Sequence, residues 1–473
     1  MPPRAKTLPE AASFRDRDAR LFREGERVAR GLSSDGLADW RALSRSALFE
    51  RFTATEELIG TADADAQVLD AIRDADPEGG WVAALVHERL PFVSYPYEWS
   101  FSMLQGAALL QLRLMAAALT QGLTMKDASP YNIQWRGSRP VFVDIGSFER
   151  ARPGEPWAGY RQFCMLFLYP LLLEAYRGVA FQPWLRGRID GIPAQEFRRL
   201  FALRDGFRPG VFKHVFLHAS LERRNEARSS DLRGELSEAG FDSRIVAANV
   251  TKLEKLVRSL SSRVGRSTWQ GYRATCSYDE EDRLAKEHFV RRVISQRRRQ
   301  LAWDLGCNDG HFSRIASGGA DLTLAIDSDA ATVDDLYRSL HDSRETTILP
   351  LVVDLADPSP GLGWRNQERA ALLDRGAPDL TLCLALVHHL SIARNLPLRE
   401  VVDWLRSLDS EVVVEFAHRD DPMVERLLAN KRPGAHPDYE LEVFDRLLRD
   451  SFEIVESLPL PSGMRTLDLV RPA

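Results

Sequence analysis

Cysteine is scarce in this chain, and no two cysteines are close in sequence. The 473 residues contain four of them, Cys164, Cys276, Cys307 and Cys383, without any CxxC pair. Such spacing argues against a disulfide framework and against a structural zinc site. We therefore expect a protein of a reducing compartment, located in the cytoplasm.

Long hydrophobic runs are also lacking. Residues 1–20 contain no apolar core of the kind that a secretory signal requires. The most apolar stretch, Phe163–Tyr176, is too short to span a bilayer and contains Pro170. We expect this stretch to form a buried helix, and we expect no association with a membrane.

The chain has little net charge. The formal charge is −5 at pH 7, with 28% charged and 44% hydrophobic residues, as in soluble globular proteins. This balance gives no electrostatic argument for binding nucleic acid or an anionic membrane. It does not exclude a local basic surface, so nucleic acid is disfavoured rather than ruled out.

The length predicts at least two domains, because 473 residues exceed one ordinary hydrophobic core. The polar, charge-dense segment His218–Arg244 is the best candidate for a connection between them. An amphipathic pattern then begins the second half. We therefore expect one domain over residues 1–245 and another over residues 246–473.

The second half alternates strand and helix patterns. Continuous apolar runs such as Leu301–Gly306 and Leu322–Asp327 are typical of buried parallel strands, and a helical pattern over residues 331–343 follows them. The chain ends in two apolar runs around a Pro-Ser-Gly turn, which predicts an antiparallel hairpin. An α/β fold is therefore expected for this half.

A glycine-containing loop follows the first of these strand patterns. Gly306 and Gly310 permit a sharp turn and a close approach of the backbone to a ligand. Asp327 ends the next strand pattern, where a carboxylate can accept two hydrogen bonds from a ribose diol. The loop lacks the G-x-G-x-x-G spacing, and Asp309 would repel a pyrophosphate. A nucleoside cofactor without phosphate is favoured over NAD, with an ordinary tight turn as the alternative interpretation.

These features resemble the class I S-adenosylmethionine-dependent methyltransferases over about residues 267–472. The resemblance implies a Rossmann-like seven-stranded sheet with an antiparallel last strand, and S-adenosyl-L-methionine as the cofactor. It implies that Asp327 holds the ribose, with Asp354 and Leu355 beside the adenine. Around the amino acid part of the cofactor it places Asp304, Gly306, Asn308 and Gly310. Asn308 is a departure, since many members have glycine there.

More narrowly, two segments resemble the nodulation protein NoeA-like group of methyltransferases. They are VDLADPSPGLGWR, residues 353–365, and LCLALVHHLSIARNLPL, residues 382–398. This closer resemblance carries no acceptor substrate with it.

Two kinds of side chain are candidates for the chemistry of methyl transfer. A hydroxyl or amine acceptor must lose a proton, and histidine suits that task near neutral pH. His388 and His389 follow the fourth strand pattern, and His389 is slightly favoured as the base, with a structural role for both as the alternative. Trp269 and Tyr272 precede the first strand and are candidates to cover the cofactor by cation–π attraction. Their alternative is core packing.

The first half contains a second motif, Asp127-x4-Asn132 followed by Asp144. It resembles the catalytic and metal-binding loops of kinase-like folds, especially small-molecule kinases, and implies an α+β domain. In that family the first acid accepts a proton, and positions matching Asn132 and Asp144 hold magnesium. Met125 replaces the usual histidine, and no glycine-rich phosphate loop is present. Arg30 is the candidate substitute for the missing lysine.

We interpret the first domain as a degenerate, substrate-recognising module without a metal, unless its kinase-like site is active. The second domain is expected to methylate a small-molecule or glycan acceptor, with a modified RNA base still open. One alternative is a bifunctional enzyme that also phosphorylates a small molecule. Another is a non-catalytic cofactor-binding protein. The sequence does not indicate an oligomeric state.

Overall fold

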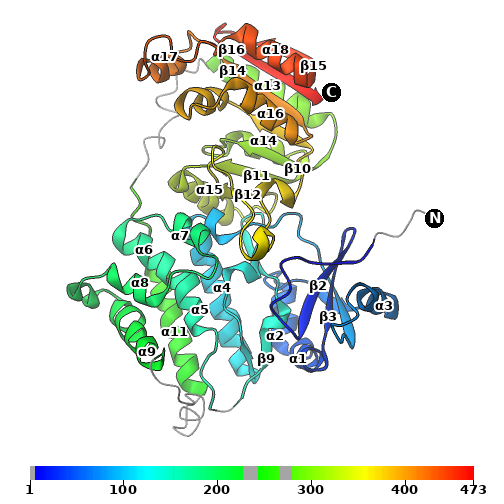
Figure 1. The fold of residues 1–473 in the computed structure, drawn as a ribbon, viewed down its shortest axis with the longest axis vertical. Coiled ribbons are helices and arrows are strands. Elements are labelled where there is room, and N and C mark those ends of the chain that lie inside the picture. The colour runs from blue at the N-terminus through cyan, green and yellow to red at the C-terminus, as the bar shows by residue number, and fades with distance from the viewer. Residues whose placement is uncertain (1–5, 153, 227–242, 266–279) are drawn as a thin grey trace. The chain divides into compact units, whose positions relative to one another are not determined.

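The computed structural model describes residues 6–152, 154–226, 243–265 and 280–473. The chain divides into two compact units, which Figure 1 traces from blue at the N-terminus to red at the C-terminus. Unit 1 comprises Met1–Trp135, Pro140–Val264 and Gly361–Arg369. Unit 2 comprises Arg136–Arg139, Gly265–Pro360 and Ala370–Ala473.

Unit 1 begins with a five-stranded antiparallel sheet in the order β1-β2-β3-β5-β4. Helix α3 (Ala66–Ala75) begins at Asp65, whose side chain accepts a hydrogen bond from the N–H of Val68. Val68 and Ile72 then pack with Trp81 in the apolar cluster of this sheet. The strands are β1 (Leu8–Pro9), β2 (Ala19–Glu24), β3 (Arg27–Leu32), β4 (Thr61–Asp63) and β5 (Ala83–His87), and α1 (Ser34–Ser44) and α2 (Ala47–Ala54) follow β3.

The rest of unit 1 is mainly helical. Two short strand pairs, β6 with β9 and β7 with β8, frame the predicted kinase-like motif. Their bounds are β6 (Leu123–Met125), β7 (Ile133–Arg136), β8 (Arg139–Phe142) and β9 (Phe148–Arg150). The helices are α4 (Phe101–Thr120), α5 (Tyr160–Phe163), α6 (Tyr169–Arg177), α7 (Gln182–Gly187), α8 (Ala194–Arg199), α9 (His218–Glu226) and α11 (Ser243–Ser259). A π-helical segment, Cys164–Leu168, joins α5 to α6 and is buried throughout, which confirms the buried helix predicted for this stretch.

Helix α4 is the central helix of this part. Among the described residues it alone is long and apolar enough to cross a membrane, but 56% of its apolar window is buried inside the protein. Gln105 donates hydrogen bonds to the carbonyls of Val257 and Leu260, 2.7 and 2.8 Å away, at the end of α11. Helix α4 is therefore a core helix of unit 1.

The division of the chain differs from the expected boundary at residues 245 and 246. Helix α11 packs on α4 and belongs to unit 1, because its apolar face is buried there rather than in the second half. The predicted connection over His218–Arg244 begins with helix α9, which packs on α8, and residues 227–242 lie outside the described residues. Charge density alone did not distinguish a solvated helix from a linker.

Unit 2 contains one mixed sheet of seven strands in the order β12-β11-β10-β13-β14-β16-β15. The five strands from β12 to β14 are parallel, whereas β16 is antiparallel to β14 and to β15. The α/β class with a mixed sheet is therefore confirmed. The bounds are β10 (Arg299–Leu305), β11 (Ala320–Asp327), β12 (Ile348–Val352), β13 (Leu380–Cys383), β14 (Glu411–Ala417), β15 (Phe452–Pro459) and β16 (Arg465–Pro472).

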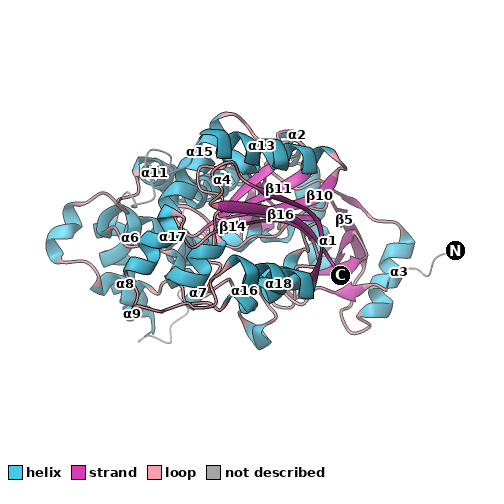
Figure 2. Ribbon diagram, turned by 90° about the horizontal axis from the view of Figure 1, so that it is seen from above, coloured by secondary structure: helices cyan, strands magenta, loops and turns pink. Residues whose placement is uncertain are grey.

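Helices cover both faces of this sheet, which is why its central strands are continuous apolar runs. In Figure 2, α13 and α15 lie on one side of β11, β14 and β16, and α16 and α18 lie on the other. Phe289, Val290 and Val293 on α13 are fully buried against the sheet at helical spacing. The helices of unit 2 are α13 (Glu280–Ser295), α14 (His311–Ser317), α15 (Ala330–Asp342), α16 (Leu398–Ser407), α17 (Pro422–Ala429) and α18 (Leu441–Ser451).

Candidate functional site

A cavity of about 990 Å³ lies within unit 2, beyond the carboxyl ends of β10, β11, β12 and β13. The strand order reverses direction between β10 and β13, and ligands of open α/β sheets bind at such a position. Of the residues predicted from the sequence, those that line the cavity are Asp304, Gly306, Asn308, Asp327, Asp354, Leu355 and His389.

Asp327 ends strand β11 and is held by backbone donors. Its two carboxylate oxygens accept hydrogen bonds from the N–H groups of Asn308 and Asp329, at 3.0 and 2.9 Å. Burial raises the pKa of Asp327, and these N–H groups oppose the rise. Within the described residues, no cationic side chain forms an ion pair with it. Each oxygen keeps a further lone pair, so the carboxylate can accept two hydroxyl donors.

Asp304 is the next-to-last residue of strand β10 and is almost fully buried. The Ser313 hydroxyl donates a hydrogen bond to its carboxylate at 2.5 Å. Burial raises the pKa of Asp304 to about 7; the Ser313 hydroxyl opposes this rise, and the nearby charge of Asp327 adds to it. This wall of the cavity is therefore acidic. Within the described residues, neither Asp304 nor Asp327 forms an ion pair with a cation, which favours a ligand carrying positive charge.

The glycine-containing loop has two glycines with different functions. Both have positive φ, 72° at Gly306 and 76° at Gly310. The N–H groups of Gly306 and Cys307 donate to the carbonyl of Ile326 at 2.8 and 3.0 Å, which holds the loop against β11. A Cβ at Gly310 would lie 2.6 Å from a methyl carbon of Leu336 on α15. Gly310 therefore allows α14 to begin close to α15 and does not line the cavity, contrary to its predicted contact with the cofactor.

Asp354 and Leu355 follow strand β12 on the far side of the cavity. The N–H of Ala356 donates to Asp354 at 3.0 Å, and Arg394 forms an ion pair with the same carboxylate. Both side chains of this pair are about half exposed, 49% for Arg394 and 41% for Asp354. An ion pair so exposed is weak and easily displaced.

The structure separates the two candidate histidines. His388 is fully buried and does not line the cavity, and neither of its ring nitrogens has a hydrogen-bond partner among the described residues. Its prediction as a catalytic residue is therefore not supported by its position. His389 lines the cavity and begins the π-helical segment His389–Ala393. Burial, with a smaller contribution from Arg465, lowers the pKa of His389 to about 4, so the ring is neutral near pH 7 and weakly basic.

The predicted aromatic cover cannot be located in the same way. Trp269 and Tyr272 lie outside the described residues. Within the described residues, Phe312 is an aromatic side chain that lines the cavity, and the ammonium of Lys286 lies 5.5 Å from its ring centre. The sequence analysis named neither residue as part of the site.

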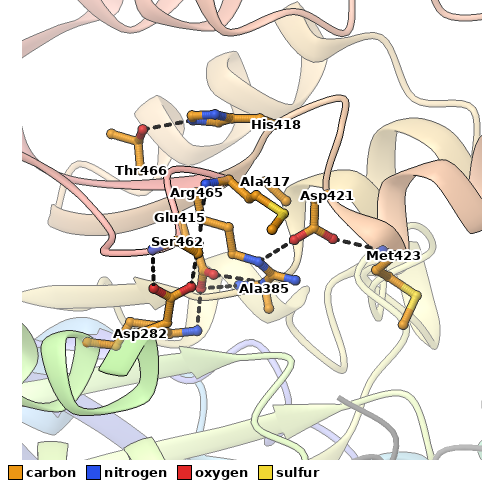
Figure 3. Close-up of polar contacts among 12 residues, drawn as sticks. Asp282, Ala385, Glu415, Ala417, His418, Asp421, Met423, Ser462, Arg465 and Thr466 are labelled. Atoms are coloured by element: carbon orange, nitrogen blue, oxygen red, sulfur yellow. Dashed lines mark hydrogen bonds and ion pairs between the residues drawn. The ribbon is translucent and has the colours of Figure 1, made fainter. Parts of the chain in front are cut away.

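A buried network of charges supports the wall of the cavity near His389 (Figure 3). Glu415 on β14 binds Lys286 at 2.6 Å and Arg465 at 2.9 Å, and Arg465 also binds Asp421 at 2.7 Å. Burial alone would raise the pKa of Glu415, but Lys286 and Arg465 outweigh it and hold the pKa at about 2.

This network fixes the backbone of the cavity wall. Glu415 accepts a hydrogen bond at 2.9 Å from the N–H of Ala385, which has a positive φ of 51°. Ala385 and Lys286 both line the cavity. The only signal in the sequence was a lysine at an apolar position of α13, one turn before Phe289 and Val290.

The residues of the predicted kinase-like motif in unit 1 form hydrogen bonds and an ion pair with one another and with nearby side chains. Asn132 donates hydrogen bonds at 3.1 Å both to Asp127 and to the hydroxyl of Ser147, which donates to Asp144 at 2.6 Å. Arg30 on β3 forms an ion pair with Asp144 at 2.7 Å. Burial would raise the pKa of Asp144, but Arg30 and the other donors hold it below its usual value.

The same cluster contains a candidate proton acceptor, Asp127. Burial raises the pKa of Asp127, and the charge of Asp144 adds to this rise. Arg30 also donates to His87 at 3.3 Å, and burial followed by the Arg30 charge lowers the pKa of His87 to about 3. Within the described residues, no group of three or more acidic, histidine or cysteine side chains is arranged to hold a metal ion.

Comparison with known proteins gives one close relative. The chain is 33% identical over 460 residues to nodulation protein NoeA of Rhizobium meliloti (strain 1021), covering 97% of this chain and 94% of the relative. The predicted resemblance to the NoeA-like group is therefore confirmed. No family model matches the chain.

Solved structures match the chain only distantly. The N-methyltransferase NodS from Bradyrhizobium japonicum WM9 is 14% identical, with a TM-score of 0.30, and the match covers 41% of this chain and 99% of NodS. The magnesium protoporphyrin IX methyltransferase ChlM from Synechocystis PCC 6803, with bound SAH, is 19% identical, with a TM-score of 0.30, over 42% of this chain and 91% of ChlM. Matches at this distance say nothing about the activity of this chain.

Proposed function

The chain belongs to the nodulation protein NoeA family, and from this membership and the cavity of unit 2 we propose that it is an S-adenosylmethionine-dependent methyltransferase. The observation that carries the proposal is Asp327. This buried carboxylate ends β11 beside a glycine loop and is oriented by two backbone N–H groups, at the position that suits a ribose diol.

The residues of unit 2 fit this cofactor by charge as well as by position. S-adenosylmethionine carries a sulfonium and an ammonium group, and the cavity presents Asp304 and Asp327 with raised pKa values. Asp327 would hold the ribose, Leu355 with Asp354 the adenine, and Asp304 with the loop the amino acid part. Positive charge in this cavity relieves the cost of burying two neighbouring carboxylates.

The cofactor supplies an electrophilic methyl carbon, and the chain must position the acceptor and remove its proton. His389 is neutral at pH 7 and lines the same cavity, so its ring nitrogen can accept that proton from a hydroxyl or an amine. Lys286 and Arg465 hold Glu415, and Glu415 fixes the backbone at Ala385, which lines the cavity. The acceptor is a small molecule or a glycan.

Unit 1 is proposed as the module that recognises the acceptor. Its kinase-like cluster retains Asp127 and Asn132, but the charge of Asp144 is already compensated by Arg30. A magnesium ion would have to displace this arginine, which works against phosphoryl transfer. We therefore assign acceptor binding rather than catalysis to the domain expected over residues 1–245. The main part of this domain ends at Val264.

The cofactor is tested by thermal unfolding of the full chain with S-adenosylmethionine, S-adenosylhomocysteine, NAD or Mg-ATP. A ligand present at about 100 times its Kd stabilises the folded state by about 2.7 kcal/mol. We expect this stabilisation from the two adenosyl ligands, and we expect none from NAD. A shift with Mg-ATP alone would move the chemistry to unit 1 and contradict the proposal.

The role of His389 is tested by kinetics once an acceptor is known. His389→Gln is expected to lower kcat by about 100-fold or more while leaving the Kd of S-adenosylmethionine unchanged. His388→Gln is the matched control for losing a histidine at this turn. If His389→Gln leaves kcat unchanged over the whole pH range, His389 is not the base.

A further inference from the structure

Unit 1 carries exposed apolar side chains gathered in one short part of the chain. Leu203 and Phe207, which begin and end the 3₁₀ helix Leu203–Phe207, are 78% and 95% exposed. The π-helical segment Phe212–Leu217 follows and continues directly into α9. Phe212, Leu217 and Leu221 along it are 63%, 45% and 46% exposed. These five residues are called the apolar surface below.

The helix geometry aligns three members of the apolar surface. Phe212 and Leu217 are five residues apart within the π-helical segment, where i to i+5 hydrogen bonds place such residues above one another. Leu217 and Leu221 are four residues apart at the α-helical continuation, so they share the same face. An uninterrupted α-helix would turn Phe212 away from the other two, so the π-helical turn creates the stripe.

The 3₁₀ helix lies beside this stripe rather than apart from it. A Cβ placed on Gly206 would lie 3.1 Å from the ring of Phe216 and 4.0 Å from the ring of Phe212. The backbone of the 3₁₀ helix at Gly206 therefore lies against Phe216 and near Phe212. Large apolar side chains so exposed and so close together mark a contact surface in soluble proteins.

The chain segment that carries the apolar surface is also rich in basic residues. Residues 198–223 contain six arginines or lysines and two acids, although the whole chain has a net charge of −5. The two acids are engaged: Asp205 is buried against Arg177, and Glu222 binds Arg161 at 2.5 Å. The exposed cations are Arg199, Arg204, Lys213 and Arg223.

We infer, contrary to the expectation from overall composition, that this surface of unit 1 docks on a membrane that contains anionic lipid. The apolar side chains would enter the boundary between headgroups and acyl chains, and the four cations would bind lipid phosphates. Figure 1 draws α8 and α9 next to each other in this part of unit 1, and Arg199 is the last residue of α8.

Two other occupants fit less well. In a symmetric dimer the same surface would face itself, which would bring its cations against one another. Single-stranded nucleic acid would need aromatic rings for its bases, whereas Leu203, Leu217 and Leu221 make up most of the apolar surface and cannot stack.

The test is co-sedimentation of the full chain with lipid vesicles. Vesicles of phosphatidylcholine alone are compared with vesicles that also contain phosphatidylglycerol, each at low and high salt. We expect binding to the mixed vesicles that weakens at high salt, because the anionic surface potential is screened. Absence of binding to both kinds of vesicle would overturn the inference.

Variants assign the binding to this surface. The double change Phe207→Glu and Phe212→Glu is expected to weaken binding by about tenfold or more, since two large apolar side chains are lost from the contact. Arg204→Glu with Lys213→Glu should remove the dependence on phosphatidylglycerol. Trp364→Glu is the matched control, because Trp364 is 66% exposed in a different segment, and it should bind as the unchanged protein does.

Three further results would contradict the inference. They are unchanged vesicle binding by the Phe207→Glu, Phe212→Glu variant, a dimer of the unchanged protein that this variant dissociates, and tight binding to a single-stranded oligonucleotide without vesicle binding. The thermal shift with S-adenosylmethionine is expected to be the same in all these variants. A failure here is therefore distinguishable from a failure of the proposed methyltransferase activity.

Discussion

Each unit has a partly buried aspartate at its candidate site, and the two differ in how their charge is compensated. Asp144 in unit 1 has an arginine at 2.7 Å, and its pKa is held below the usual value. Asp327 in unit 2 accepts hydrogen bonds from backbone N–H groups and, within the described residues, forms no ion pair, and its pKa is raised. A carboxylate with its own cation is closed to a ligand's positive charge or to a metal ion, whereas one without a cation is open to a ligand.

The same contrast holds for the neighbours of the two acids. In unit 1, Asn132 donates a hydrogen bond to Asp127, and Ser147 donates one to Asp144. In unit 2, Asp304 joins Asp327 at the wall of a cavity of about 990 Å³. The difference teaches that a motif matched by residue type is not a functional site until its charges are shown to be available.

The largest expected effect comes from making Asp144 resemble Asp327. Arg30→Ala leaves a buried carboxylate without its cation, and we expect it to lower the free energy of unfolding by about 3 kcal/mol. This is the lower end for a buried pair, because the Asp144 side chain is 23% exposed. Urea denaturation measures the change, and Arg30→Lys should retain most of the stability. Equal stability of Arg30→Ala and the unchanged protein would refute the compensation.

The next largest effect is on cofactor affinity and comes from replacing Asp327, which forms no ion pair with a cation among the described residues. Asp327→Ala is expected to raise the Kd of S-adenosylmethionine by about 100-fold, because two hydrogen bonds to a charged acceptor are lost. Unlike Arg30→Ala, it should not lower the free energy of unfolding by a comparable amount, since it removes an uncompensated charge. Isothermal titration calorimetry and urea denaturation measure the two quantities. Unchanged affinity in Asp327→Ala would remove the main support for the cofactor site.

A smaller effect follows from the pKa of about 7 for Asp304. The folded protein binds a proton that the unfolded chain has released by about pH 4, so this residue's contribution to stability decreases as pH rises from about 4 to 7. Positive charge on the ligand favours the carboxylate, so affinity for S-adenosylmethionine should rise about tenfold from pH 6 to pH 8. Titration calorimetry across this range checks the rise, and Asp304→Asn should abolish it.

The smallest expected effect is at the exposed pair of Arg394 and Asp354. Arg394→Ala should change the free energy of unfolding by no more than about 1 kcal/mol, because water already screens this pair. Urea denaturation measures this change in the free energy of unfolding, and Arg30→Ala provides the comparison with a less exposed ion pair. A loss as large as that of Arg30→Ala would mean that exposure does not separate the two kinds of pair.

The sequence by itself determined the local features of unit 2. Its strand and helix periodicities predicted β10, β11 and the terminal hairpin, and the strand-end acids Asp304, Asp327 and Asp354 all line the cavity. The strand predictions are confirmed because parallel strands that are covered on both faces need continuous apolar residues. The acids share one cavity because strand-end positions converge at one edge of the sheet, and their contacts with a cofactor stay a prediction.

Tertiary structure decided which side chains meet. The ion pair of Arg30 with Asp144 and the network around Glu415 join residues that are far apart in sequence, so no local pattern reveals them. The π-helical turn that begins at His389 brings this ring to the cavity and leaves His388 in the core. Helix α11 belongs to unit 1 because its apolar face packs against α4. The periodicity of apolar residues determines which face of a segment can be buried. Which other element packs against that face is determined only by the tertiary structure.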